Sequence, residues 1–215
     1  MIPTTHEFEN MPLWRDFIKE YALTEVQSAQ FATYLQMVRT SNELFNLTAI
    51  TDPGQIISYH FQDSLAISQC IDLKSITMIA DVGSGAGFPG IPLKIVFPHL
   101  RVQLIEVSHK KVNFLNDVMR ALNLENIEVV DLDWRTFLRK TQEPIDLFVS
   151  RASLHTDELI RMFKPTCPYN SKRLAYWASK EWLPTKIDEP FLIKDQEYMI
   201  RNKKRRIIFF GKSIK

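Results

Sequence analysis

The stretch DVGSGAGFPG at residues 81–90 constrains this chain more than any other segment. It holds four of the six glycines found in 215 residues. The apolar run ITMIA precedes it and IPLKIVF follows it, so the pattern predicts a turn between a strand and a helix. Glycine at such a turn lets the backbone approach a ligand where a side chain would obstruct it. We therefore expect a nucleotide-like ligand at this turn.

After residue 75, short apolar runs alternate with helical patterns. The alternation predicts βαβ units in an α/β, Rossmann-like fold, with a mostly parallel sheet and helices on both faces. The segments EYMIRN and RRIIFFGK, joined by a tight basic link, are expected to form an antiparallel edge. The expected parallel strands are ITMIADV, VQLIEV, IEVV, IDLFVS and RLAYWAS.

We expect residues 1–70 to form a helical cap over a core of residues 71–215. The cap and the core are expected to form one structural unit, and the core to include a basic C-terminal hairpin. Thr24 and Gln27 have the spacing of a capping box, and apolar residues then recur at helical spacing from Phe31 to Val38. A second helix is expected to open at Asp52, with Pro53 in its first turn. One face of that helix would pack against the core. This face is formed by Ile56, Ile57, His60, Phe61, Ser64 and Leu65.

The composition is that of an ordinary globular protein, with 45% hydrophobic and 24% charged residues. The first residues lack a basic region followed by an apolar run, and no apolar stretch approaches the roughly 20 residues of a membrane span. Cys70 and Cys167 lie far apart, and the five histidines do not cluster. We expect a cytoplasmic monomer with free thiols, no membrane association and no metal site.

Positive charge is concentrated at the C-terminal end. Residues 201–215 carry seven Lys or Arg and no acids, and subtracting these from the net charge of +2 leaves −5 for residues 1–200. The segment RNKKRR runs directly into the apolar IIFF. Two interpretations stay open: a solvated tail, or a patch that binds phosphate groups.

Two cofactors compete for the glycine-rich turn. Gly85, Gly87 and Gly90 satisfy the GxGxxG pattern of nicotinamide-binding loops, and an acid, Glu106, follows about 20 residues later. However, Pro89 removes a backbone donor that a pyrophosphate would need. The YxxxK pattern at residues 176–180 lies on an expected strand, where residues four apart are about 13 Å from each other.

The spacing DxGxGxG, formed by Asp81, Gly83, Gly85 and Gly87, fits S-adenosylmethionine better. It is the first motif of Rossmann-like methyltransferases. Glu106, at the end of the second expected strand, can accept hydrogen bonds from two ribose hydroxyls. The turn has no Lys followed by Ser or Thr, so it is not a P-loop.

Several motifs in order make the sequence more specific: FNLTAITDP, HFQDSLA, DVGSGAGFPGIPLKI, HKKVNFL, LNLENIEVV and SRA. Together they resemble the ribosomal small-subunit methyltransferase G family, also called glucose-inhibited division protein B. The resemblance implies an enzyme that methylates N7 of a guanine in the 530 loop of 16S rRNA with S-adenosylmethionine. Its partner would be 16S rRNA or an assembling small ribosomal subunit.

The resemblance also implies roles for matching residues. Arg151 would position substrate and cofactor, and no acid or base is assigned because guanine N7 has a free lone pair. Asn46, His60 and Asp63 are further matches, and the simplest interpretation of the last two is a hydrogen-bonded pair that locks the cap. Expected RNA-binding residues are Lys110, Lys111, Arg151, Lys180 and Arg205. Expected cofactor-binding residues are Asp81, Gly83, Ser84, Gly85, Gly87, Phe88, Glu106, Asp133, Trp134, Arg135 and Arg151.

This chain departs from the family where the adenine would bind. Asp133, Trp134 and Arg135 replace the usual Arg-x-Glu; Asp133 can still accept from the adenine amino group and Trp134 can cover the ring. Tyr59 stands where the family commonly has Arg, and Ser41 where it has Trp. A second hypothesis is therefore a noncatalytic RNA-binding or ribosome-assembly protein that keeps the methyltransferase fold. A nicotinamide oxidoreductase is a distant third.

Overall fold

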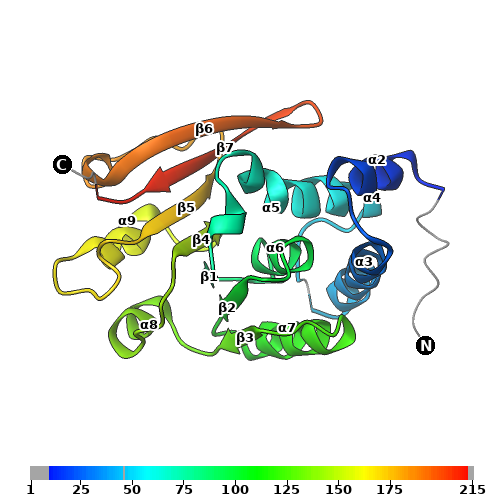
Figure 1. The fold of residues 1–215 in the computed structure, drawn as a ribbon, viewed down its shortest axis with the longest axis horizontal. Helices are drawn as coiled ribbons and strands as arrows, with labels where there is room; N and C mark the ends of the chain where they lie inside the picture. Colours follow the sequence, from blue (N-terminus) through cyan, green and yellow to red (C-terminus); the bar gives the residue numbers. More distant parts are fainter. Residues whose placement is uncertain (1–9, 46, 213–215) are drawn as a thin grey trace.

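A seven-stranded sheet forms the centre of the fold (Figure 1), in a computed structural model that describes residues 10–45 and 47–212. The strand order is β3-β2-β1-β4-β5-β7-β6. The first five strands in this order are parallel, β7 runs antiparallel to β5, and β6 runs antiparallel to β7. The strands are β1 (Met78–Val82), β2 (Arg101–Ile105), β3 (Ile127–Val130), β4 (Leu147–Arg151), β5 (Arg173–Ala178), β6 (Leu192–Ile200) and β7 (Lys203–Phe210).

This topology confirms the predicted α/β, Rossmann-like fold and its antiparallel C-terminal hairpin. The strand β6 begins at Leu192, five residues before the expected Glu197. The basic residues from Lys203 to Arg206 lie in β7, where they pair with β6 and Arg206 also pairs with β5, so this run is not a solvated tail. The chain reverses its direction of strand addition between β1 and β4, and ligands of open parallel sheets bind at such a switch point.

Helices cover both faces of the sheet (Figure 1). On one face lie α2 (Pro12–Glu20), α3 (Glu25–Phe45), α6 (Gly90–Val96) and α7 (His109–Ala121); on the other lie α8 (Trp134–Lys140) and α9 (Thr156–Leu159). Short helical turns are η3 (Leu73–Ser75), η4 (Ile160–Phe163) and η5 (Glu189–Phe191). Among the described residues, no helix combines the length and the apolar character needed to cross a membrane.

The sequence signals for the N-terminal helices are confirmed. Thr24 and Gln27 form a reciprocal capping box, in which each backbone N–H donates to the other side chain at 3.0 and 3.2 Å. Asp52 caps the next helix by accepting from the Gln55 N–H at 2.8 Å. That helix is one continuous rod formed by α4 (Pro53–Ile56), η1 (Ile57–Gln62, a π-helical stretch), α5 (Asp63–Leu65) and η2 (Ala66–Gln69).

The rod is buried on more sides than the expected single face. Ser58 and Tyr59 are buried together with the predicted residues, and Lys203 and Arg205 of the β6–β7 hairpin lie over the Tyr59 ring. Phe31 of α3 and Phe61 of the rod belong to the same hydrophobic cluster as Leu104 of β2. The opposite face of the sheet buries a second cluster around α8. Cys70 and Cys167 are free thiols, as predicted.

Candidate active site

The glycine-rich loop is held against the end of β2. The N–H groups of Gly83 and Ser84 both donate to the Ile105 carbonyl, at 2.9 and 3.1 Å. Gly83 adopts φ +68°, and a Cβ there would lie 2.4 Å from the Cβ of Ser153. Gly85 adopts φ +60°, but a Cβ there would meet no atom closer than 3.9 Å. Gly85 therefore faces open space, where a ligand can approach the backbone.

Asp81 supports the loop from beneath. Its carboxylate is fully buried, and Oδ2 accepts from the Gly90 N–H at 2.8 Å. Oδ1 has no hydrogen-bond partner within the described part of the chain, and burial raises the pKa of Asp81 to about 7. The side chain is not among those lining the cavities described below. Any contribution of Asp81 to ligand binding therefore acts through the loop.

Glu106 connects the end of β2 to the same loop. Its Oε2 accepts from the Gly85 N–H at 2.9 Å, and its Oε1 accepts from the N–H groups of Val107 and Ser108, each at 3.0 Å. The residue is only 8% exposed. The carboxylate is thus oriented by three backbone donors and keeps acceptor capacity on Oε2, since each carboxylate oxygen can accept two hydrogen bonds.

Two cavities adjoin at this carboxylate. One, of about 380 Å³, lies against the end of β3; the other, of about 540 Å³, lies between the glycine loop and the rod. Both are lined by Gly83, Glu106, Val107 and Leu154, so they adjoin along these residues, and we treat them together as one cleft. We call them the β3 lobe and the rod lobe. The other residues of the rod lobe include Thr48, His60, Ser84, Gly85, Phe88, Lys111 and Arg151.

The three divergent residues Asp133, Trp134 and Arg135 all line the β3 lobe. Asp133 caps α8, since its carboxylate accepts from both the N–H and the hydroxyl of Thr136. Trp134 is buried and its indole N–H donates to the Glu158 carbonyl at 2.9 Å. Arg135 makes a two-pronged ion pair with the Glu158 carboxylate, at 2.9 and 2.6 Å. The residues that break the family pattern therefore form an ordered wall.

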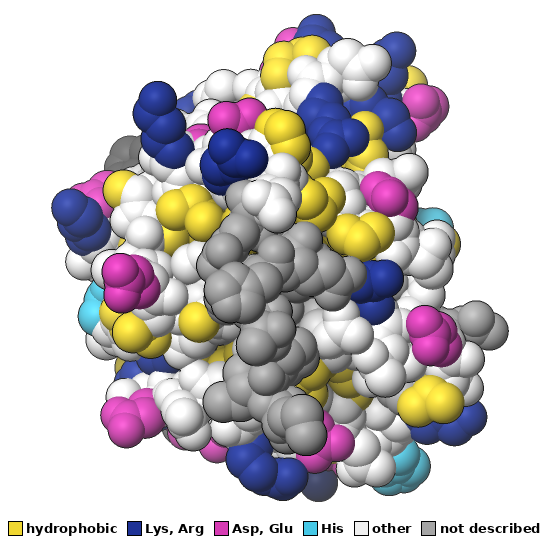
Figure 2. Space-filling view, turned by 90° about the vertical axis from the view of Figure 1, so that its right-hand side faces the viewer, with side chains coloured by type: hydrophobic (Ala, Val, Ile, Leu, Met, Phe, Trp, Pro, Cys, Tyr) yellow, Lys and Arg dark blue, Asp and Glu magenta, His cyan; other side chains and the backbone are white. Residues whose placement is uncertain are grey.

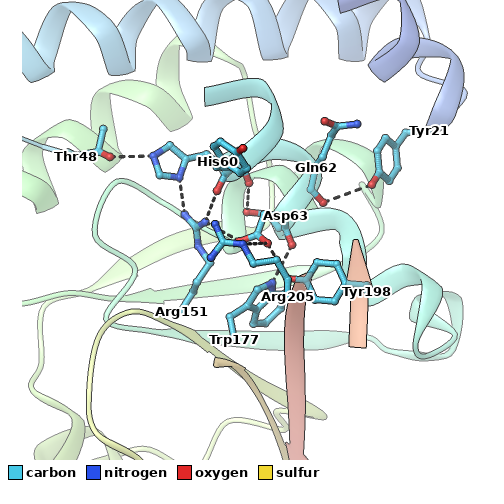
Figure 3. Close-up of polar contacts among 11 residues, drawn as sticks. Tyr21, Thr48, His60, Gln62, Asp63, Arg151, Trp177, Tyr198 and Arg205 are labelled. Carbon is cyan, nitrogen blue, oxygen red and sulfur yellow. Dashed lines mark hydrogen bonds and ion pairs between the residues drawn. The ribbon is translucent and has the colours of Figure 1, made fainter. Parts of the chain in front are cut away.

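Arg151 is the polar centre of the rod lobe (Figure 3). Its Nη1 donates to the Tyr59 carbonyl at 2.8 Å and to Asp63 Oδ2 at 3.2 Å, and its Nη2 lies 3.0 Å from His60 Nδ1. The guanidinium also lies over the Phe88 ring, 5.1 Å from its centroid. The rod thus holds an arginine that the end of β4 supplies.

The hydrogen bonds of His60 define its state. Arginine only donates, so Nδ1 of His60 must accept and Nε2 must carry the proton that it shares with Thr48 Oγ1, 2.9 Å away. Burial and the nearby Arg151 lower the pKa of His60 to about 3. The interpretation of His60 and Asp63 as a pair bonded to each other was wrong, because both side chains bind the guanidinium between them.

Asp63 connects this arginine to the C-terminal hairpin. The Tyr198 hydroxyl donates to Asp63 Oδ1 at 2.7 Å, and Arg205 Nε lies 3.9 Å from the same oxygen. The indole N–H of Trp177 donates to the Asp63 carbonyl at 2.8 Å. Sequence analysis missed Thr48, Trp177 and Tyr198; only the alternation of the hairpin strands offered a signal for Tyr198, since it places that residue on the inner face.

The residues predicted to bind RNA are only partly gathered. Lys111 lines the rod lobe and Arg205 joins Arg151 at Asp63, while Lys110 is exposed beside Lys111. Lys180 is exposed just after β5 and lines neither lobe of the cleft. Asn46 lies outside the described residues.

A family model described as rRNA small subunit methyltransferase G matches residues 27–208. Among curated relatives of that name, the protein of Bacillus pumilus (strain SAFR-032) is 39% identical over 149 residues, which are 68% of this chain and 62% of the relative. The protein of Staphylococcus saprophyticus is 46% identical over 108 residues, covering 50% of this chain and 45% of the relative. The chain thus matches about three fifths of the length of its first relatives.

Solved structures share the fold at low sequence identity. A mutant of MtNAS aligns with a TM-score of 0.59 and 12% identity, over 97% of this chain and 80% of that one. TrmK of M. capricolum, in complex with S-adenosylhomocysteine, aligns with a TM-score of 0.53 and 13% identity, over 70% of this chain and 68% of that one. At these identities the likeness supports the fold alone.

Proposed function

Since the chain belongs to the rRNA small subunit methyltransferase G family, we propose that it methylates N7 of a guanine in the 530 loop of 16S rRNA with S-adenosylmethionine. One observation carries the proposal: the glycine loop, Glu106 and Arg151 line a single two-lobed cleft. In this proposal the β3 lobe receives the adenine of the cofactor, and the rod lobe, which Arg151 lines, receives the nucleobase.

The residues of the cleft fit this cofactor. The open space at Gly85 admits the amino-acid portion against the loop, and Glu106 Oε2 retains a lone pair for a ribose hydroxyl. Trp134 and Leu132 offer apolar surface to the adenine. When bound, S-adenosylmethionine supplies a methyl group activated by a sulfonium centre. The rod lobe suits a polar base, because Arg151 offers N–H donors and His60 is neutral.

Methylation of guanine N7 requires the base to be oriented but requires no proton transfer. Guanine N7 carries a free lone pair, so no general base is needed. His60 is neutral but uses Nδ1 to accept from Arg151, and Asp81 is buried beneath the loop. Neither is placed to take a proton from the substrate. Arg151 can donate to the O6 edge of the guanine with its remaining N–H groups, which would orient N7 toward the methyl group.

The noncatalytic alternative rests on the divergent residues 133–135. Because these residues form an ordered wall of the β3 lobe, we do not favour it. We further propose that the protein acts as a monomer in the cytoplasm, on 16S rRNA or an assembling small subunit. Family membership supports the RNA substrate.

Calorimetric titration with S-adenosylhomocysteine, with NADH as the control ligand, tests the cofactor assignment. We expect binding of S-adenosylhomocysteine in the micromolar range and none of NADH. Transfer of a radiolabelled methyl group to unmodified 16S rRNA, followed by mapping of the modified base, tests the reaction. Cofactor binding without transfer to any rRNA would restore the noncatalytic alternative.

A further inference from the structure

Strand alternation divides the basic run of β7 between two faces of the hairpin. Lys203 and Arg205 face the rod, together with their cross-strand partners Ile200 and Tyr198. Lys204 and Arg206 face the opposite way, because successive side chains of a strand point to opposite sides. The two faces differ in how their charge is compensated.

Acids of β6 neutralise the face away from the rod. Lys204 pairs with Glu197 at 2.6 Å, and Arg206 forms a two-pronged ion pair with Asp195. Arg206 also donates to the Trp182 carbonyl at 2.8 Å. The charges on this face are therefore largely balanced within the hairpin.

On the rod side, three cations surround the ring of Tyr59. Lys203 Nζ lies 4.5 Å from the ring centroid, and the guanidinium carbons of Arg205 and Arg201 lie at 5.6 and 6.0 Å. Arg201 also donates to the Gly54 carbonyl. We call Tyr59 with Arg201, Lys203 and Arg205 the Tyr59 platform.

The platform holds more positive charge than the described residues around it balance. Within residues 10–45 and 47–212, the acid paired with a platform cation is Asp63, whose Oδ1 lies 3.9 Å from Arg205 Nε. Its Oδ2 already accepts from Arg151, and its Oδ1 accepts from Tyr198. Arg205 Nε is buried and makes no hydrogen bond to any described residue. One carboxylate thus faces two guanidinium groups, and neither Arg201 nor Lys203 has an ion pair among the described residues. Such uncompensated cations favour an anionic partner.

We propose that the Tyr59 platform binds the phosphate backbone of the RNA next to the target nucleotide. The platform adjoins the cleft, because Arg151 donates to the carbonyl of Tyr59 itself. Figure 2 shows Lys and Arg side chains gathered at the top of one face, where the turn of the hairpin lies. Arg201 and Lys203 are exposed and Arg205 is half-buried, so a large ligand can reach the first two. A single strand whose base enters the rod lobe would carry its adjacent phosphates past Arg205, Lys203 and Arg201.

This inference rests on the proposed function, since it names an RNA contact beside the same cleft. Its test compares Lys203→Gln with Lys204→Gln, two substitutions that remove the same charge from adjacent positions of one strand. The affinity of the full chain for unmodified 16S rRNA is measured by filter binding at several salt concentrations. S-adenosylhomocysteine titration of each variant verifies that the fold is intact.

We expect Lys203→Gln to weaken RNA binding and to reduce the slope of log affinity against log salt by about 0.7 to 0.9, the loss of one phosphate contact. Lys204→Gln should leave the slope unchanged. Arg201→Gln should act like Lys203→Gln. The variant that carries both substitutions should show about twice the reduction in the slope of log affinity against log salt. Equal effects of Lys203→Gln and Lys204→Gln, or no effect of either, would overturn the proposal.

Methyl transfer by the unmodified chain separates the two proposals. If it methylates 16S rRNA while the two lysine variants behave alike, the platform is wrong and the proposed function stands. If it binds the RNA in a Lys203-dependent way without methylating it, the platform stands and the enzymatic function fails. Absence of both methylation and RNA binding would overturn both.

Discussion

The Nη2 group of Arg151 lies 3.0 Å from Nδ1 of His60, although 91 residues separate the two along the chain. This contact joins the end of β4 to the rod and holds the guanidinium at the rod lobe of the cleft (Figure 3). Arg151, which can only donate, fixes the tautomer, and Thr48 Oγ1 accepts the Nε2 proton on the other side of the ring. The orientation of Arg151 therefore depends on a neutral histidine.

Replacing His60 should impair methyl transfer more than cofactor binding. His60→Leu removes the acceptor of Arg151 Nη2, and a hydrogen bond to a charged group contributes about 1.5–3 kcal/mol. We expect kcat to fall roughly 10- to 100-fold, with affinity for S-adenosylhomocysteine changed less than about threefold. His60→Gln, which keeps an acceptor, should recover part of the rate. Equal losses in both variants would contradict a positioning role.

Glu106→Gln should weaken cofactor binding. The carboxylate accepts from three backbone N–H groups, and an amide nitrogen in place of one oxygen would oppose at least one of these donors. We expect calorimetry to show roughly 10- to 100-fold lower affinity for S-adenosylhomocysteine. Glu128→Gln on β3 is the control, since Glu128 contacts Gln103 and lies outside the cleft. Similar affinity in both variants would refute the assignment of Glu106.

Gly83→Ala and Gly85→Ala should fail in different ways. Both positions have positive φ, which costs an alanine about 1–2 kcal/mol. At Gly83 the added methyl also collides with Ser153. Urea unfolding should therefore show that Gly83→Ala lowers the free energy of unfolding by about 1–3 kcal/mol more than Gly85→Ala does. At Gly85 the methyl enters open space, so calorimetry should show weakened S-adenosylhomocysteine binding in a chain that stays folded. Unimpaired binding by Gly85→Ala would mean that the ligand does not approach the loop there.

Asp81 and His60 should make opposite contributions to the pH dependence of stability. The pKa of His60 is lowered to about 3, so its stabilising contribution is lost as pH falls below the unfolded value of 6.5. The pKa of Asp81 is raised to about 7, so its contribution is present at acid pH and lost as pH rises from 3.8 toward 7. In the unmodified chain the two largely offset each other.

Single variants should reveal each contribution. Between pH 7 and pH 5, Asp81→Asn should lose about 2 kcal/mol more stability than the unmodified chain, because only the histidine contribution remains. His60→Gln should shift the other way by a similar amount. Urea unfolding at both pH values measures these differences. Parallel pH profiles for all three proteins would show that neither group titrates as described.

Local patterns in the sequence predicted the elements of the fold and much of the cleft. The capping box at Thr24, the cap at Asp52 and the strand–helix alternation depend on residues close in sequence, and all are confirmed. The placement of Gly83 and Glu106 together followed from parallel strands that end at one edge of a sheet. Resemblance to a family added Arg151, which no local pattern indicates.

Other assignments required the tertiary structure. The role of Asp81 as a support under the loop depends on which side of β1 is buried. The shared binding of His60 and Asp63 to Arg151 depends on the distance between the rod and β4, and no periodicity encodes that distance. The sequence also left open whether the basic run was a solvated tail or a phosphate-binding patch.

The sequence by itself thus determined the α/β class, the family and the glycine loop, because hydrogen bonding and hydrophobic periodicity act over a few residues. Only the tertiary structure decided which charges remain uncompensated. In RNKKRR, Lys204 and Lys203 are neighbours of identical chemistry, yet one pairs with Glu197 and the other lies over Tyr59. The pleat of β7 turned them to opposite faces, and the packing of the hairpin on the rod placed different partners on each.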